Sequence, residues 1–548
     1  MGEIIMDTNN NDIQKYWSLK EYEPRTEQIR IIEEIITAMG LGFKNIILEA
    51  GTGIGKSAIA TTIANLCDNS YILTMTNQLQ KQYLDDFNYM LTEIKGRRNY
   101  TCNHGGTCEE CYMEQLKEKK CNDCEYILAL REALTSKNII TNYDYIWFAG
   151  NYTELFSKRD LLIMDEAHNL ESKIMGLISR TLNRKSIIKN YGFDIFDKIM
   201  NKELNLKDLK EENYWINILE KLITIEKTFK NNTTDDQEIK KIDNKIQNYQ
   251  TLINSLSSED ERWIIELPSK KQIISDKDFK AGLKVEFKPL TVNQYAENIF
   301  RFGETRLFLT GTLGNKDKFC EWLGLDADDT FYIYQKSPFS VSNRPIIRDY
   351  IGSMSGRDEN HKPNWRNPKA IMKIKEIVSK HAGQKGVIHT SSNEQAWYLK
   401  KNLDSKNVWV VGGSTREETL AAFEKSYKPI TLIGAGIKDG VDFKGDKCRY
   451  QIIFKMPYPR LEGQIFTRNY YDPTWYKYQT IMPLMQAYGR GIRDLEDYCT
   501  TYVIDSDFDQ LLNNYKYLFN EYFLEAIHPP LEDKVKRKRI KRNEEIKI

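Results

Sequence analysis

A glycine-rich segment near the N-terminus has the residue types and spacing of a nucleotide-binding loop. It follows a short β-branched run at residues 44–49 and precedes a helical pattern over residues 56–66, which is the context a P-loop requires. Glycine lets consecutive backbone N–H groups close around phosphate oxygens, and the helix N-terminus adds its positive end. Lys56 would then reach the β- and γ-phosphates, and Ser57 would hold Mg²⁺. The predicted phosphate-binding residues are Gly51, Thr52, Gly53, Ile54, Gly55, Lys56 and Ser57.

Two acidic residues follow a second buried strand pattern. Residues 160–164 (DLLIM) lead into Asp165-Glu166-Ala167-His168. Because the carboxyl ends of parallel strands border the nucleotide crevice, this pair and the P-loop are expected to share one site. Asp165 is expected to orient Mg²⁺ through water and Glu166 to polarise the attacking water. An acidic helix N-cap is the alternative interpretation.

A third candidate group lies far downstream, in residues 486–493 (QAYGRGIR), and comprises Gln486, Arg490 and Arg493. Two arginines three residues apart on a helix share one face. Such a pair is able to enter a nucleotide site between two sheet domains and to neutralise charge in the transition state. A solvent-facing basic pair is the alternative.

Five of the nine cysteines are clustered, with the spacing Cys102-x5-Cys108-x2-Cys111-x9-Cys121-x2-Cys124. In a reducing compartment this clustering indicates metal ligation rather than disulfides. Without further context the last four match a zinc-ribbon pattern. A four-thiolate site would stabilise a segment too short to build its own core. Buried cysteines without a metal are the alternative.

The elements that must position these groups alternate between apolar strand patterns and helical patterns. This order predicts an α/β fold with parallel sheets, formed twice. Residues 173–285 differ, because they are rich in Lys, Glu, Asn and Ile and mostly helix-periodic, which predicts a helical insertion. Besides residues 44–49 and 160–164, strands are predicted at 70–74, 306–310, 386–389, 407–411, 430–433, 450–455 and 500–504.

Composition excludes several classes of protein. The chain has 548 residues, 41% hydrophobic and 11% aromatic, which suffices for about three or four folded units and excludes wholesale disorder. We find neither an apolar run near the roughly 20 residues of a bilayer span nor a secretory signal, so we expect a cytoplasmic protein, or a nuclear one in a eukaryote. The net charge is +1, yet residues 534–542 contain seven basic residues. A uniformly basic surface is therefore excluded, and any polyanion site must be local.

The nucleotide motifs together resemble a superfamily 2 helicase motor, and more specifically the XPD/DinG-like iron–sulfur DNA helicases, over about residues 20–510. Gly311 stands where the family usually has Ala, and the segment from Asp505 to Asp507 lacks an arginine often found there. The further matching segments are Arg25-Thr26-Glu27-Gln28 (adenine reading), residues 74–79 (DNA contact), Thr141-Asn142-Tyr143, Thr310-Gly311-Thr312-Leu313, Gly440-Val441-Asp442-Phe443 with Gly445-Asp446, and Met456-Pro457-Tyr458.

The resemblance implies ATP and Mg²⁺ in a cleft between two RecA-like domains, with Arg25, Gln28, Gly440 and Asp442 also binding the nucleotide. It further implies a 4Fe-4S cluster, because Cys124-Glu125-Tyr126 resembles the family's segment around the fourth ligand. Zinc stays the alternative metal. The implied ligands are Cys102, Cys108, Cys111 and Cys124, with Cys121 as an alternative ligand.

The function implied is an ATP-dependent DNA helicase that moves 5′ to 3′ on single-stranded DNA, acts on forked DNA in replication, repair or recombination, and works as a monomer. A nucleotide-gated DNA clamp with a zinc ribbon is the alternative. Basic and aromatic residues near the cysteines would form a strand-separating wedge: Lys95, Arg97, Arg98, Tyr100, Tyr112 and Tyr126. The expected parts are helicase domain 1 (1–95, 128–172 and 286–335), the cluster domain (96–127), an arch-like insertion (173–285), helicase domain 2 (336–530) and a basic tail (531–548).

Overall fold

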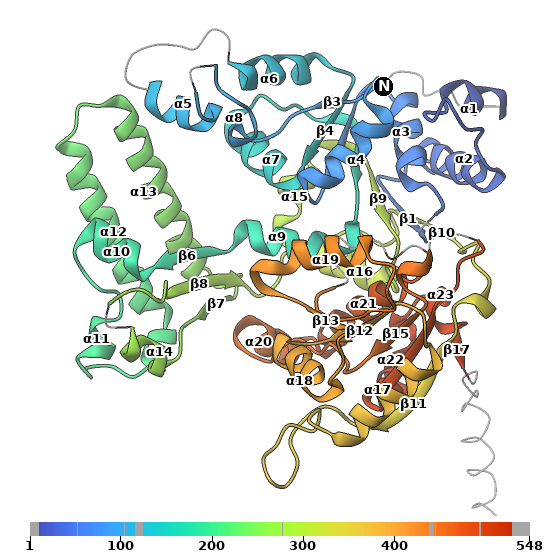
Figure 1. The fold of residues 1–548 in the computed structure, drawn as a ribbon. Coiled ribbons are helices and arrows are strands. Elements are labelled where there is room, and N and C mark those ends of the chain that lie inside the picture. Colours follow the sequence, from blue (N-terminus) through green and yellow to red (C-terminus); the bar gives the residue numbers. More distant parts are fainter. Residues whose placement is uncertain are drawn as a thin grey trace, which may run out of the picture.

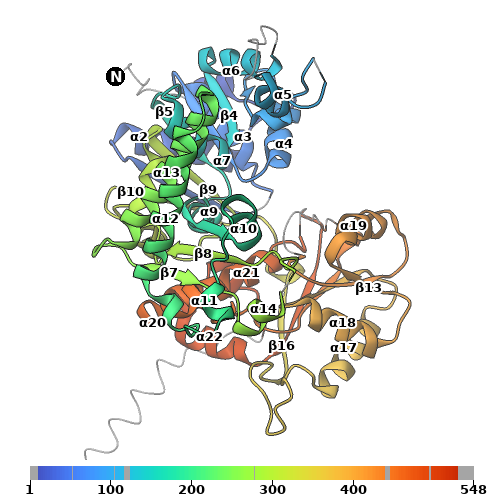
Figure 2. The same ribbon diagram turned by 90° about the vertical axis from the view of Figure 1, so that its left-hand side faces the viewer.

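Two domains, each built on a seven-stranded parallel sheet, lie one above the other in the computed structural model (Figure 1). An insertion drawn in green lies beside both domains and in front of them in the turned view (Figure 2). The structure describes residues 10–51, 53–103, 105–115, 124–276, 278–437, 443, 445–492 and 495–528. None of the helices in these ranges is long and apolar enough to cross a bilayer.

The first sheet has the strand order β10-β1-β9-β5-β2-β4-β3. Both of its faces are buried, since Ile46 and Leu48 of β1 enter one hydrophobic core while Ile47 enters the other. This explains the unbroken apolar runs of its central strands. The strands are β1 (Asn45–Ala50), β2 (Ser70–Thr74), β3 (Thr92–Glu93), β4 (Asn138–Asn142), β5 (Arg159–Met164), β9 (Gly303–Thr310) and β10 (Thr330–Gln335). The helices are α1 (Asn10–Tyr16), α2 (Thr26–Gly40), α3 (Lys56–Leu66), α4 (Asn77–Phe87), α5 (Cys108–Gln115), α6 (Glu125–Thr135), α7 (Tyr143–Tyr145), α8 (Asn151–Thr153), α9 (Leu170–Ile178), α15 (Glu297–Phe300) and α16 (Lys316–Leu323).

The second sheet has the order β13-β14-β12-β15-β16-β11-β17. The strands that follow β12 in the chain, β13 and β14, lie on one side of it, whereas β16, which follows β15, lies on the other side of β15. The strand order therefore reverses between the neighbours β12 and β15. The strands are β11 (Ile346–Gly352), β12 (Gly386–Thr390), β13 (Val408–Val411), β14 (Thr431–Ala435), β15 (Tyr450–Ile453), β16 (Thr500–Asp505) and β17 (Ile527–His528). The helices are α17 (Pro368–Lys380), α18 (Asn393–Leu403), α19 (Arg416–Lys425), α20 (Gly463–Tyr471), α21 (Pro473–Tyr488), α22 (Asp507–Tyr515) and α23 (Glu521–Leu524).

These sheets confirm the predicted α/β class, and each of the nine predicted strands is present. The insertion contains the expected helices, α10 (Arg184–Tyr191), α11 (Asp197–Met200), α12 (Glu212–Asn231), α13 (Asp236–Leu256) and α14 (Lys270–Ser275). It also has an antiparallel sheet that the helical periodicity did not predict, formed by β6 (Arg180–Asn183), β7 (Trp263–Glu266) and β8 (Lys284–Pro289). Burial alternates along β7 and β8, so these strands lack the continuous apolar runs that mark the large sheets.

A largely buried carboxylate, Glu171 of α9, joins the two domains. Trp475 of α21 donates its indole N–H to both oxygens (3.0 and 2.9 Å), and Arg468 of α20 forms an ion pair with the same group. The Arg468 guanidinium also lies 4.1 Å from the centre of the Trp475 ring. Burial raises the pKa of Glu171, although Arg468 opposes the shift. The carboxylate is therefore held by partners that belong to the second domain.

A second buried carboxylate, Glu49 of β1, makes a similar junction. Asn520 of the second domain donates its side-chain amide to Glu49 (3.1 Å), and the Tyr332 hydroxyl of β10 donates to the other oxygen (2.7 Å). Glu49 lies two residues before Gly51, so the strand that carries the glycine-rich loop contacts the second domain directly.

We expect Glu171→Ala to lower the free energy of unfolding by about 3–5 kcal/mol, because the substitution leaves the buried Arg468 charge without its carboxylate. Urea unfolding followed by tryptophan fluorescence measures the loss. The control is Asp243→Ala, which removes an exposed ion pair to Lys230 and should cost less than about 1 kcal/mol. Equal effects of the two substitutions would contradict a structural role for the Glu171 junction.

Candidate active site

The glycine-rich loop connects the carboxyl end of β1 to the N-terminus of α3, as predicted. Gly53 and Gly55 have φ values of 86° and 85°, in the left-handed region that favours glycine. A Cβ on Gly55 would lie 2.5 Å from the side-chain nitrogen of Gln28. The Lys56 ammonium lies inside the loop and donates to the Ala50 carbonyl (2.8 Å). Backbone shape and the position of Lys56 both suit phosphate binding.

Arg25 and Gln28 brace this loop from outside. Arg25 donates to the carbonyls of Gly53 and Ile54 (both 2.7 Å), and Gln28 donates to that of Ile54 (2.8 Å). The side-chain carbonyl of Gln28 in turn accepts a hydrogen bond from the Arg25 backbone N–H (2.8 Å), which fixes both residues at the start of α2. Arg25 and Gln28 thus contact the loop directly. Their predicted role in recognising the adenine base stays a prediction.

Asp165 and Glu166 follow β5 directly, at the predicted end of the strand. Asp165 is buried, and burial together with the charge of Glu166 raises its pKa to about 6. Lys56 opposes this shift, which places its ammonium within electrostatic reach of the Asp165 carboxylate. The Tyr83 hydroxyl donates to Asp165 (3.2 Å), and the nearby Ser57 side chain opposes the rise that burial causes in the pKa of Tyr83. The structure therefore brings Lys56, Ser57 and Asp165 together at the carboxyl ends of β1 and β5.

The segment after β9 lies against both motifs. His168 Nδ1 is 3.0 Å from the Thr310 hydroxyl and 3.4 Å from a Glu166 oxygen. A Cβ on Gly311 would lie 3.7 Å from the Lys56 ammonium. The Thr310–Gly311 segment therefore lies beside both the acidic pair and the glycine-rich loop.

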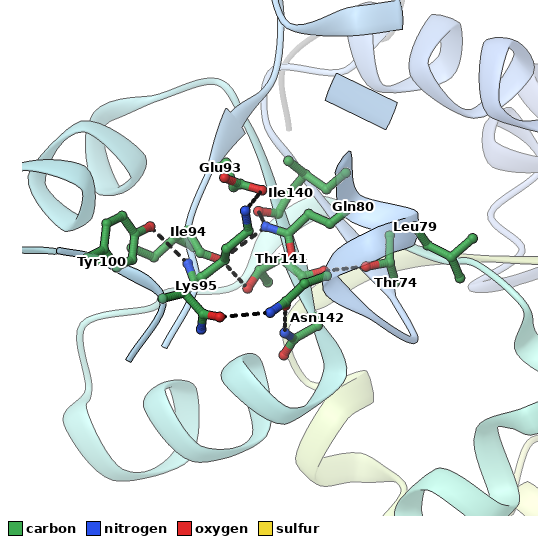
Figure 3. A network of polar contacts seen from close by, with 12 residues as sticks. Thr74, Leu79, Gln80, Glu93, Ile94, Lys95, Tyr100, Ile140, Thr141 and Asn142 are labelled. Carbon is green, nitrogen blue, oxygen red and sulfur yellow. Dashed lines mark hydrogen bonds and ion pairs between the residues drawn. The ribbon is translucent and has the colours of Figure 1, made fainter. Parts of the chain in front are cut away.

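Polar contacts link the end of β4 with α4 and with residues 93–100, the chain that leads to the cysteines (Figure 3). The Thr141 hydroxyl donates to the Ile94 carbonyl (2.8 Å), and Asn142 donates to Asn77 at the start of α4 (2.7 Å). Asn77 also donates to Asn99 (3.0 Å), while the Tyr143 hydroxyl donates to the Asp165 carbonyl (2.9 Å). The Thr141–Tyr143 segment therefore positions the acidic loop, the start of α4 and the chain that leads to the cysteines.

Four of the clustered cysteines are buried in the hydrophobic core beside the first sheet. Cys102, Cys108, Cys111 and Cys124 are all buried, at 7% exposure or less. Burial raises the pKa of Cys108, and the neighbouring thiols of Cys124 and Cys102 act in the same direction. No disulfide joins the described cysteines, and in the described ranges no group of three or more metal-binding side chains converges tightly enough to define a metal site. The donor set is that of a thiolate-bound metal, so these four residues fit the implied group by chemistry and burial.

One wedge candidate has a different environment from the one its pattern suggested. Tyr126 is buried, its hydroxyl lies 3.1 Å from that of Tyr145, and Arg97 covers its ring at 4.3 Å. Tyr100 packs edge-on against the same ring. Tyr126 is therefore a core residue that supports the cysteine segment, and its ring is covered rather than presented to a base.

The structure describes only some of the candidate nucleotide-site residues of the second domain. Gln486 lies in the last turn of α21, and Arg490 lies near His389 of β12, whose pKa it helps to lower. The prediction that Arg490 belongs to a helix face is wrong, because α21 ends at Tyr488, before the two glycines that flank Arg490. Outside the described residues lie Thr52, Cys121, Gly440, Asp442, Arg493, the Tyr112 side chain and the tail from residue 529.

Sequence reasoning missed several residues that the fold brings to the site. Tyr83 lies in α4, outside both motifs and 82 residues from Asp165, and carries no local pattern beyond helical periodicity. Glu171 and Arg468 lie in different domains, so their pairing has no sequence signal. Its position gave one sequence signal for Glu171, because it lies five residues after Glu166, in the helix that follows the acidic loop.

Comparisons with known proteins agree with this geometry. Residues 374–525 match the family model described as helicase C-terminal domain, and residues 21–193 match the model described as type III restriction enzyme, res subunit. The chain is 23% identical to a protein named "Probable ATP-dependent helicase" from Methanocaldococcus jannaschii, over 85% of this chain and 89% of that protein.

Two solved structures show the same fold. One is S. tokodaii Xpd4 (TM-score 0.53, 16% identity, 92% of this chain and 99% of that one), and the other is named XPD helicase (TM-score 0.57, 16% identity, 90% and 98%). One helicase-domain match, a helicase relative along most of the length and the shared fold together support an ATP-dependent helicase with the fold of the XPD structures.

Proposed function

We propose that this chain, an ATP-dependent helicase, moves 5′ to 3′ along single-stranded DNA and unwinds the duplex ahead of it. The observation that carries the proposal is that Lys56, after β1, and Asp165, after β5, lie at the same edge of the first sheet within electrostatic reach of each other. The Glu49 and Glu171 junctions support it, because they connect the strand before the glycine-rich loop and the helix after the acidic loop to the second domain.

In the proposed reaction Lys56 binds the β- and γ-phosphates of ATP. Ser57 and Asp165 would hold Mg²⁺, whose charge compensates the phosphate oxygens. Glu166 takes a proton from the attacking water. His168 contacts both Glu166 and Thr310, so a change in the position of the acidic loop is transmitted through it to the segment after β9. Arg490 and Arg493 act from the second domain on the charge of the transition state.

Lys56→Ala should reduce ATP hydrolysis by about 10²-fold or more, because the phosphate-binding ammonium is lost from a preorganised site. Glu166→Gln should abolish turnover to a similar extent while ATP binding is kept, since the amide is unable to accept the proton. Phosphate release and binding of a fluorescent ATP analogue measure the two effects, with circular dichroism as the folding control. DNA-stimulated turnover that persisted in Lys56→Ala would refute the assignment.

The cysteine segment is proposed to carry a 4Fe-4S cluster on Cys102, Cys108, Cys111 and Cys124. What supports this is the burial of these four thiols in the core beside the first sheet and the closeness of Cys108 to Cys124 and Cys102. The cluster would cross-link a short segment that depends on the Tyr100–Tyr126–Arg97 packing for the rest of its core. Held in this way, the segment is proposed to separate the strands at the fork.

Protein prepared without oxygen should be brown and absorb broadly at about 400 nm, as is expected of a cysteine-ligated iron–sulfur cluster. Cys108→Ser should lose iron and colour, whereas the matched control Cys320→Ser, which removes a buried thiol in α16, should keep both. Metal analysis and absorbance spectra provide the readout. A colourless wild-type protein with one zinc and no iron would favour the zinc-ribbon alternative.

Direction and strand separation are tested on partial duplexes with either a 5′ or a 3′ single-stranded overhang. We expect ATP-dependent displacement from the 5′-overhang substrate and little from the 3′-overhang one, by gel or fluorescence. The reverse preference would overturn the proposed polarity. A chain that hydrolyses ATP and binds both substrates without displacing a strand would instead be the nucleotide-gated clamp.

A further inference from the structure

A tight turn that follows α21 carries Arg490. The Gly491 backbone N–H donates to the Tyr488 carbonyl (3.4 Å), which closes the turn around Arg490. The same carbonyl accepts from the side chain of Gln451 in β15 (3.2 Å). At the other end of the turn, a Cβ on Gly491 would lie 2.6 Å from the sulfur of Cys499, the residue before β16. Because both ends of the turn are held against the second sheet, the position of Arg490 depends on that of Tyr488.

The side chain of Tyr488 is held in turn by Arg344, which lies in the linker between the two domains. The Arg344 guanidinium donates to the Tyr488 hydroxyl (3.0 Å), and this hydroxyl donates to the Arg344 carbonyl (2.9 Å). Arg344 is 1% exposed and Tyr488 is 4% exposed. A buried hydroxyl that loses such partners is left unsatisfied, so this pair of hydrogen bonds fixes where α21 ends.

The guanidinium of Arg344 is fixed on its other sides as well. It donates to the carbonyls of Phe339 (3.2 Å) and Tyr522 (2.5 Å), and it forms an ion pair with Glu525. Its plane also lies 3.8 Å from the centre of the Tyr522 ring. These contacts use the planar, five-donor fork of an arginine, which a lysine does not have.

The linker, residues 336–345 between β10 and β11, contacts the glycine-rich loop at its other end. Ser337 is buried, and a Cβ on Gly51 would lie 3.5 Å from its Cβ. The Ser337 hydroxyl accepts from the Phe339 backbone N–H (3.3 Å), and Phe339 is the residue whose carbonyl Arg344 binds. One short segment therefore touches the phosphate-binding loop and holds the turn that carries Arg490.

We propose that Arg344 is a positioning residue for ATP hydrolysis, which acts through Tyr488 to set the place from which Arg490 reaches the nucleotide. The inference rests on the proposed function, in which Arg490 neutralises charge in the transition state. An arginine in that role raises turnover by about 10³–10⁵-fold, provided that its position is held closely. Because the linker also touches Gly51, the same segment relates the turn to the glycine-rich loop.

The first test is Tyr488→Phe, which removes the hydroxyl and keeps the ring that packs against Phe523. We expect kcat for ATP hydrolysis to fall about tenfold or more, as for other small displacements of a catalytic group. KM for ATP should stay within about twofold, because the lost interaction belongs to the transition state. The matched control is Tyr502→Phe, which removes another buried hydroxyl of the second sheet, 3.0 Å from His381, and should keep wild-type kcat.

The second test repeats Tyr488→Phe in an Arg490→Ala background, with single-turnover hydrolysis of radiolabelled ATP so that slow rates are measured. A residue that acts through Arg490 should change the rate by less than about twofold once Arg490 is absent. Arg344→Lys keeps the charge beside Glu525 but not the fork, and should show the same loss and the same dependence on Arg490. Thermal unfolding verifies that each variant folds.

Unchanged kcat in Tyr488→Phe would overturn the proposal. So would an equal loss in both backgrounds, since that would indicate a general structural defect rather than an effect on Arg490. Wild-type turnover in Arg490→Ala alone would instead overturn the role that the proposed function gives to Arg490, and the positioning role with it.

Discussion

Two carboxylates with little exposure to solvent, Glu49 and Glu171, join the two sheet domains next to the glycine-rich and acidic loops. Glu49 lies at the end of the strand that leads into the glycine-rich loop, and Glu171 lies on the helix that leaves the acidic loop. Each accepts hydrogen bonds from the second domain, through Asn520 and Trp475 respectively. Since a buried charge is costly without its partners, separating the domains at either point is unfavourable.

This arrangement gives the second domain contact with both sides of the phosphate-binding crevice. The neighbouring contacts are also shared between domains: the Tyr478 hydroxyl donates to the Leu313 carbonyl (3.1 Å), and the Trp322 indole donates to Asp472 (2.8 Å). Leu313 follows the segment that touches both His168 and Lys56. A change at the crevice therefore has a continuous path of packed and hydrogen-bonded groups to the second sheet.

The cysteine segment and the insertion depend on the same scaffold in different ways. The cysteine segment joins it through asparagine side chains, because Asn142 binds Asn77, which binds Asn99. The insertion instead reaches the second domain, where Glu266 of β7 accepts from the Gln464 backbone N–H at the start of α20 (2.8 Å). The cysteine segment is thus attached to the first sheet, through Asn142 at the end of β4. The insertion instead connects the two domains.

The sequence by itself determined the parallel-sheet class, nine of the fourteen strands of the two large sheets and the residues of the glycine-rich and acidic loops. These features are local: unbroken apolar runs form strands that are buried on both faces, and glycine spacing sets a loop whose φ values other residues rarely adopt. The tertiary structure decided what depends on residues distant in the sequence, including the Tyr83 contact with Asp165, the Glu171–Arg468 pair, the burial of Tyr126 and the Arg344 contact with Tyr488. Local patterns report which face of an element is apolar, but which polar groups meet across two domains is set by how those domains pack.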